Sequence, residues 1–334
     1  MSSDVVLAVD GGSFKTHLAL VRADGSLLAL VRGAPSSPHL LGVEGCVGLI
    51  EQLLGEAMTA AGLERAAGAV AEVGQVFLAG ADLPAEVEAL QAAMAPRGWA
   101  ERLTVANDTF AVLRAGTDRG WGVALVCGAG INCVGVGPDG RHARFPALGE
   151  ITGDWGGGGD VGLAGLAAAV RSADGRGPLT VLERAVADYF GLPAPHEVAE
   201  AIHLGELPRR RIAELAPIVL RNAGEDAVAA EIAGRLVSEA VAFVWTILQR
   251  LDLTDEPAEV VLGGGLLRGE GGPVVDGIAA RLGDLAPAAT VRLADAPPIA
   301  GAALLALDTL GAGPEAGERA RGELSAAVER EPPE

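Results

Sequence analysis

Apolar residues in the first 32 positions occur in short runs that glycine-containing turns interrupt. The runs cover residues 5–9, 17–22 and 27–32, and the interruptions fall at Gly11–Gly12 and Asp24–Gly25. Short apolar runs bounded by Gly and Asp-Gly are typical of β-strands joined by hairpin turns. The opening of the chain is therefore predicted to form three consecutive strands.

Helical and strand patterns then alternate. The predicted elements are, in chain order, a helix over 43–62, a strand over 75–80, a helix over 83–95, a strand over 102–108 and a helix over 109–116. The resulting order β-β-β-α-β-α-β-α indicates an α/β fold.

The same pattern begins again near residue 117. Residues 122–145 read as strand, Gly turn, strand, Asp-Gly turn and strand, and Asp139–Gly140 corresponds to Asp24–Gly25. Such repetition indicates a duplicated unit. A mostly helical stretch, a strand and a helix are expected at 160–250, 258–265 and 298–310. The expected domains are 1–116, 117–312 with a helical insertion at about 160–250, and a C-terminal helix with an acidic tail at 313–334.

The net charge of −19 at pH 7 limits the partners of this protein. Nucleic acids and anionic membranes bind proteins through an excess of Lys and Arg, so we expect neither as a partner. A phosphorylated ligand would have to be held locally, by backbone amides and a metal ion. No apolar run reaches membrane-spanning length, and no basic segment followed by an apolar core opens the sequence, so we expect a cytoplasmic protein.

Glycine-rich turns follow three of the predicted strands, in the segments Asp10–Gly12, Cys127–Gly130 and Gly263–Gly265. Successive backbone amides in such a turn can bind an anion without side-chain charge. One such turn is weak evidence, because Gly after a strand is commonly only a turn. Together, on a duplicated unit, they predict a cleft between two similar halves that each contribute a phosphate loop.

Six segments carry a more specific resemblance. They are DGGSFKT, ANDTFAVLRAGT, CGAGINCVGVGPDG, GEITGDWGGGGDVG, VVLGGG and PPIAGAALLAL, which occur in this order within residues 5–310. They resemble the N-acetylglucosamine kinase family, which is grouped with the BadF/BadG/BcrA/BcrD ATPases. The resemblance implies two ribonuclease-H-like domains of the actin-like ATPase fold, with a nucleotide and sugar cleft between them.

The resemblance implies a MgATP site on the first turn. Asp10 matches the carboxylate that orients Mg²⁺ on the phosphates, through water, although an Asp that caps the turn is the alternative. Phe14 stands where the family carries a small hydroxyl residue, so Ser13 is the substitute donor. The nucleotide contacts implied here are Gly11, Gly12, Ser13, Lys15 and Thr16.

Asp108 matches the catalytic base of the family. Phosphoryl transfer to a sugar hydroxyl needs an acceptor for the departing proton, although an Asp before a helix can also be its N-cap. Asn107 either binds a sugar hydroxyl or turns the chain. The acetamido-binding Asn of the family falls at Ser37, which leaves N-acetylglucosamine, glucosamine, N-acetylmuramic acid and glucose open as substrates.

The second half supplies the remaining implied contacts. In the phosphate loop, Ala129 and Ile131 replace two residues that carry hydroxyls in the family. The implied backbone contacts of this loop are Gly128, Ala129 and Gly130. The residues implied to cover the adenosine are Gly263, Gly264 and Gly265. Asn132 and Asp154 match sugar-binding residues. Trp155 replaces an acidic residue and is suited to stack on a sugar face. The Gly156–Gly159 segment lets backbone approach a ligand closely or is an inert flexible loop.

These assignments predict a kinase that transfers the γ-phosphate of MgATP to a hydroxyl, expected to be O6, of an amino sugar; a homodimer is the family expectation. Two alternatives stay open. An ATPase activator of the same group needs cysteines that bind an iron–sulfur cluster, and Cys46, Cys127 and Cys133 do not sit where it requires them. A non-catalytic sugar or nucleotide sensor is the other, because hydroxyls are lost at Ala129 and Ile131.

Overall fold

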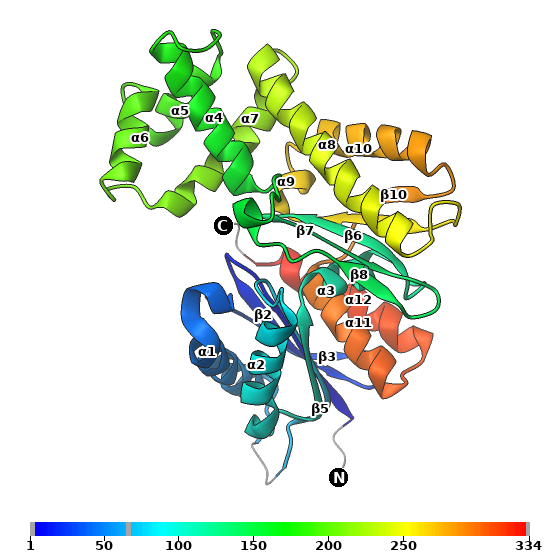
Figure 1. Ribbon diagram of the computed structural model, residues 1–334. Coiled ribbons are helices and arrows are strands. Elements are labelled where there is room, and N and C mark those ends of the chain that lie inside the picture. Colours follow the sequence, from blue (N-terminus) through cyan, green and yellow to red (C-terminus); the bar gives the residue numbers. More distant parts are fainter. Residues whose placement is uncertain (1–3, 65–67, 332–334) are drawn as a thin grey trace. The chain divides into compact units, whose positions relative to one another are not determined.

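The computed structural model describes residues 4–64 and 68–331, which fall into two compact units (Figure 1). Of the described residues, unit 1 comprises 4–64, 68–121 and 294–331, and unit 2 comprises 122–293. The elements of unit 1 are β1 (Val5–Gly11), β2 (Thr16–Arg22), β3 (Leu27–Gly33), α1 (Pro38–Ala60), β4 (Ala71–Leu78), α2 (Pro84–Met94), β5 (Ala100–Asn107), α3 (Thr109–Gly116), α11 (Pro298–Leu310) and α12 (Pro314–Glu329).

Unit 1 is built on a five-stranded sheet with the order β3-β2-β1-β4-β5. β1 pairs antiparallel with β2 and parallel with β4, which pairs parallel with β5. Side chains alternate between the two faces of a strand. Odd-numbered residues of β1 therefore pack against α1 and α2, and its apolar even-numbered residues pack against α3, α11 and α12 (Figure 1).

Unit 2 contains a second five-stranded sheet. Its elements are β6 (Gly122–Cys127), β7 (Ile131–Val136), β8 (His142–Arg144), α4 (Gly158–Ala173), α5 (Leu182–Phe190), α6 (Pro195–His203), α7 (Ala216–Asn222), α8 (Ala227–Arg250), β9 (Glu259–Gly263), α9 (Gly265–Arg268), α10 (Gly272–Leu285) and β10 (Thr290–Leu293). The sheet order β8-β7-β6-β9-β10 and its pairing repeat those of unit 1. The predicted two-domain α/β fold with an internal duplication is confirmed.

Three elements depart from the sequence-based expectations. The helix expected from residue 43 is preceded by one further turn, which Gly42 separates from it with φ 68° and ψ 173°. Helix α10 and strand β10 lie in a stretch for which the sequence analysis assigned no element. β10 is a four-residue strand whose residues are partly or fully exposed, so its apolar signal is weak.

Helix α11 lies in unit 1, whereas the expected second domain of 117–312 included it. α11 packs against α3, β1 and β4. Gly301 permits this contact, because a Cβ atom there would lie 1.8 Å from the carbonyl oxygen of Ala111 on α3. The chain therefore returns to unit 1 after β10.

Helix α12 fastens the β2–β3 hairpin of unit 1. Arg319 forms an ion pair with Asp24 at 3.0 Å, and Glu323 accepts a hydrogen bond from the amide of Leu27 at 2.8 Å. Glu331 follows the helix and contacts Nε2 of the buried His17 at 3.0 Å. Among the described residues, no helix has the length and apolar character needed to cross a membrane.

Candidate nucleotide and sugar site

The sheet of unit 1 brings Asp10 and Asp108 to the same edge. Gly11, Leu78 and Asn107 are in register at the ends of β1, β4 and β5. Asp10 immediately precedes this row and Asp108 immediately follows it. Since neighbouring strands lie about 4.8 Å apart, the β1 and β5 backbones are separated by about 10 Å.

The turn after β1 is closely packed. The amide of Gly12 donates to the carbonyl of Lys15 at 2.8 Å, and a Cβ atom on Gly11 would lie 2.1 Å from Oγ of Ser36. The Ser36 hydroxyl is buried and has no hydrogen-bond partner in the described part of the chain. Sequence reasoning missed Ser36, whose hydroxyl occupies the space that a side chain at position 11 would need.

The predicted nucleotide contacts of this turn differ in exposure. Ser13 is exposed, and 55% of Phe14 is exposed, so neither side chain is used in the core. Thr16 is fully buried, and its hydroxyl donates to the carbonyl of Ala34 at 2.7 Å. Thr16 therefore has a structural contact, and its role toward nucleotide stays a prediction.

Asp10 has an unusual electrostatic environment. Burial raises the pKa of its carboxyl from 3.8 to about 7, and the positive charge of Lys15 opposes this rise. A desolvated carboxylate gains when a cation replaces its proton. Because Mg²⁺ prefers hard oxygen ligands, the environment of Asp10 fits the metal role that the sequence predicts.

Asp108 begins α3 without capping it. The carbonyl of Asp108 accepts hydrogen bonds from the amides of Ala111 and Val112, whereas its side chain makes no capping hydrogen bond. The sequence left open whether Asp108 is a base or an N-cap. Its carboxylate is not committed to the helix, which favours the first interpretation.

Asn107 holds the turn that carries Asp108. Its amide nitrogen donates to Asp82 at 2.8 Å, and its amide oxygen accepts from the backbone amide and the hydroxyl of Thr109. Asn107 is 1% exposed. These contacts give Asn107 a positioning role, and its predicted contact with the sugar stays untested.

Ser37 reaches the same edge from the start of α1. It is buried, and a Cβ atom on Gly80, in the loop after β4, would lie 3.0 Å from its hydroxyl. Asp82 in that loop was not among the predicted site residues, because its link to the site is a hydrogen bond from Asn107 that only the structure reveals. Ligand atoms of His39, Asp82 and Glu86 lie within 4.8 Å of one another. Glu86 is already occupied by His39 and by two backbone amides at the start of α2.

The glycine segments of unit 2 pack directly on one another. The amides of Gly158 and Gly159 at the start of α4 donate to the carbonyls of Gly128 and Ala129 at 2.8 and 3.0 Å. A Cβ atom on Gly157 would lie 2.2 Å from Cα of Gly130. The loop contributes only carbonyl oxygens to these two hydrogen bonds. A phosphate would need donors, and the amides of Ala129 and Gly130 are not used in these bonds.

The third glycine turn joins the same cluster. Gly264 has φ 94°, and a Cβ atom there would lie 2.1 Å from the carbonyl oxygen of Cys127. The Gly263–Gly265 turn thus contacts the residue that precedes the Gly128–Gly130 loop. The structure therefore brings together within unit 2 the turns that the sequence assigned to phosphate and adenosine.

The predicted sugar contacts of unit 2 lie close to this cluster along the chain, Asn132 after Gly130 and Asp154 before Gly157. Asp154 is buried and accepts a hydrogen bond from the hydroxyl of Thr152 at 2.5 Å. The side-chain oxygen of Asn132 accepts from the amide of Cys133 at 2.8 Å. Trp155 does not present both ring faces, because the guanidinium of Arg235 lies 4.1 Å above its ring centroid.

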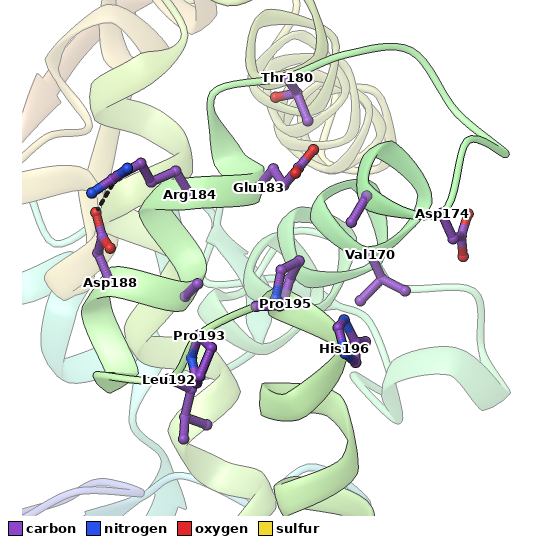
Figure 2. Close-up of a pocket in the computed structure, with 13 residues that line it drawn as sticks. Val170, Asp174, Thr180, Glu183, Arg184, Asp188, Leu192, Pro193, Pro195 and His196 are labelled. Carbon is purple, nitrogen blue, oxygen red and sulfur yellow. Dashed lines mark hydrogen bonds and ion pairs between the residues drawn. The ribbon is translucent and has the colours of Figure 1, made fainter.

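A cavity of about 850 Å³ lies elsewhere in unit 2, where α4, α5 and α6 meet (Figure 2). None of the predicted site residues lines it. Several of its polar side chains are paired with protein groups, among them Arg184 and Asp188, which form an ion pair at 3.1 Å (Figure 2). It contributes nothing to the candidate site.

The repeated strand order, with a glycine turn after the first strand of each sheet, defines the class of two-domain actin-like ATPases and sugar kinases. Residues 7–306 match the BadF/BadG/BcrA/BcrD ATPase family, and the chain belongs to that family.

Two sugar kinases have sequences similar to this chain. The chain is 26% identical over 267 residues to an N-acetylmuramic acid/N-acetylglucosamine kinase of Clostridium acetobutylicum, covering 78% of this chain and 85% of the relative. It is 23% identical over 334 residues to an N-acetyl-D-glucosamine kinase of Dictyostelium discoideum, covering 92% and 99% of the two chains.

Solved structures show the same architecture. A candidate N-acetylglucosamine kinase from Chromobacterium violaceum aligns with a TM-score of 0.71 at 26% identity, over 91% of this chain and 99% of that one. A ROK family glucokinase from Streptomyces griseus, solved with glucose and AMPPNP, aligns with a TM-score of 0.53 at 18% identity, over 97% and 99%. The second likeness concerns the fold alone.

Proposed function

We propose that this protein is an ATP-dependent amino sugar kinase that phosphorylates O6. The observation that carries the proposal is the placement of Asp10 and Asp108 at one edge of one sheet, with the Asp108 carboxylate not used to cap α3. The two kinase relatives support the choice of an amino sugar.

Asp108 acts as the base in this proposal. The sugar oxygen forms a bond to the γ-phosphorus, the bond from that phosphorus to the β,γ-bridging oxygen breaks, and the hydroxyl proton passes to the Asp108 carboxylate. Such transfers depend mainly on positioning and charge stabilisation. Asn107 fixes the strand–helix junction through Asp82 and Thr109, so it orients the base.

Asp10 orients Mg²⁺, which when bound neutralises phosphate charge. The Asp10 carboxylate would hold the ion through water, and the positive charge of Lys15 favours the charged form of this carboxyl. The turn after β1 and the amides of Ala129 and Gly130 in the second loop supply backbone donors to the phosphates. Asp154 accepts hydrogen bonds from sugar hydroxyls. We further propose that the protein is cytoplasmic and forms a homodimer. Light scattering, which measures the molar mass in solution, tests the homodimer.

The activator alternative has little support from the cysteines. Burial raises the pKa of the Cys46 thiol to about 11 and that of Cys127 to about 12, and the Cys133 pKa also lies well above its ordinary value. Iron–sulfur clusters are held by thiolates. Three buried thiols that resist ionisation are better explained as core residues.

A coupled assay of ADP release over hexoses and amino sugars tests the proposal. We expect turnover with at least one amino sugar, formation of its 6-phosphate by phosphorus NMR, and loss of kcat by about a thousandfold or more in Asp108→Asn. Asp284→Asn, at an exposed position on α10, is the matched control. If no sugar is phosphorylated, or if Asp108→Asn keeps wild-type kcat, the proposed function is wrong.

A further inference from the structure

Arg235 on α8 stacks on Trp155, the residue that follows the predicted sugar contact Asp154. Its guanidinium carbon lies 4.1 Å above the centroid of the Trp155 ring. The next residue on α8, Leu236, packs against Gly156, where a Cβ atom would lie 3.0 Å from its Cδ1. Helix α8 therefore places Arg235 over the Trp155 ring and Leu236 against Gly156.

Arg235 forms an ion pair with Glu239 but makes no hydrogen bond to the described part of the protein. Its side chain is 56% exposed, and Nε lies 3.6 Å from a carboxylate oxygen of Glu239, too long for a hydrogen bond. Within residues 4–64 and 68–331 the guanidinium makes no hydrogen bond, although it carries five N–H donors. Its terminal nitrogens therefore remain available to a ligand.

Two other arginines of unit 2 stack on aromatic rings but are occupied. Arg250 lies 4.7 Å above Phe145 and donates to the carbonyl of Arg144. Arg211 lies 4.9 Å above Phe190 and forms a close ion pair with Glu214. Stacking alone therefore does not leave a guanidinium open. Arg235 differs from both because its guanidinium donates no hydrogen bond and its only close charge partner among the described residues, Glu239, lies 3.6 Å from Nε.

We propose that Arg235 binds a carboxylate of the sugar substrate, so that the preferred substrate class is an amino sugar acid. This inference rests on the proposed function, because it uses Asp154 as a sugar contact. A guanidinium binds a carboxylate through two parallel hydrogen bonds, and the Trp155 ring reduces the conformational freedom lost on binding. Trp155 is uncharged and does not oppose an anion, and the Glu239 carboxylate pairs with Nε and leaves the two terminal nitrogens to the ligand.

This assignment changes the role expected for Trp155. The sequence suggested that its ring stacks on a sugar face, but Arg235 covers one face of that ring. Trp155 then supports the arginine and does not need to contact the sugar. An anionic oxygen of the nucleotide is the other ligand with suitable chemistry, and the experiment below separates the two.

Three sugars test the inference: N-acetylglucosamine, N-acetylmuramic acid and the methyl ester of N-acetylmuramic acid. The acid and its ester have nearly the same shape but differ in charge. We expect wild-type kcat/KM for the acid to exceed that for the ester by about 10- to 100-fold, the range of a hydrogen bond between charged groups. Arg235→Gln should bring this ratio close to one, and Arg235→Lys should retain part of it. Arg250→Gln is the matched control and should keep the wild-type ratio.

Calorimetric titration with the acid and the ester gives a second readout that does not require turnover. If no sugar is phosphorylated, the proposed function fails, whereas a preference for the acid that Arg235→Gln removes still supports this inference. Equal binding and equal kcat/KM for acid and ester in the wild type would overturn it. A rise of KM for ATP in Arg235→Gln with an unchanged acid-to-ester ratio would also overturn it, because the bound anion would then be phosphate.

Discussion

Replacing Asp10 by Asn should stabilise the ligand-free protein while removing its ATP turnover. The carboxyl of Asp10 is desolvated at the end of β1, and Lys15 compensates it only in part. Asn keeps the size of the side chain but has no charge to bury. The variant therefore separates the stability of the fold from the binding of Mg²⁺, which needs the carboxylate.

The pKa of Asp10 sets the size and the pH range of the effect. A native pKa of about 7 above an ordinary value of 3.8 means that the native state binds the proton more tightly than the unfolded chain does. The wild type therefore loses stability, relative to Asp10→Asn, as pH rises from about 4 through 7. Three pH units at 1.36 kcal/mol each give an upper limit of about 4 kcal/mol above pH 7.

Urea unfolding of both proteins at pH 4.5, 6, 7 and 8 measures this difference. We expect an advantage of Asp10→Asn of about 1 kcal/mol at pH 4.5 that grows to about 4 kcal/mol by pH 8. MgATP should raise the Tm of the wild type only. Asp284→Asn is the control for loss of a carboxylate elsewhere. A difference that does not change with pH, or an Asp10→Asn variant that is less stable at pH 8, would refute the reasoning.

Two further substitutions test a contact in each unit. Gly264→Ala should lower the free energy of unfolding by about 3 kcal/mol, because φ is 94° at this residue and the new Cβ atom meets the carbonyl of Cys127. Gly283→Ala, within α10, is the control and should be neutral or stabilising, so equal urea midpoints for the two variants would contradict the reasoning. Glu331→Gln should cost about 1 kcal/mol, because a charged acceptor of the buried His17 becomes neutral, and unchanged stability in thermal unfolding would show that the contact contributes nothing.

Local sequence patterns were sufficient for much of the fold. The three opening strands, the helix at 298–310 and the repeated Gly and Asp-Gly turns depend on neighbouring residues, and each has its counterpart in the structure. β10 and α10 were missed, the first because a four-residue strand gives a short signal. The unit to which α11 belongs depends on a close helix contact at Gly301, which no local pattern reveals.

The candidate site divides in the same way. Asp10 and Asp108 stand out in the sequence because each follows an apolar strand, but the register of β1, β4 and β5 decides that they share an edge. The sequence could not choose between a base and an N-cap for Asp108. The helix geometry bears on that choice, since the side chain does not cap α3.

By itself, the sequence determined the order of the elements, their duplication and the glycine turns, because these follow from spacing between residues that are close along the chain. Only the tertiary structure decided the partners of side chains, such as His17 with Glu331 and Trp155 with Arg235. Burial and long-range packing create those contacts, and the raised pKa of Asp10 has the same origin. Neither is encoded in local periodicity.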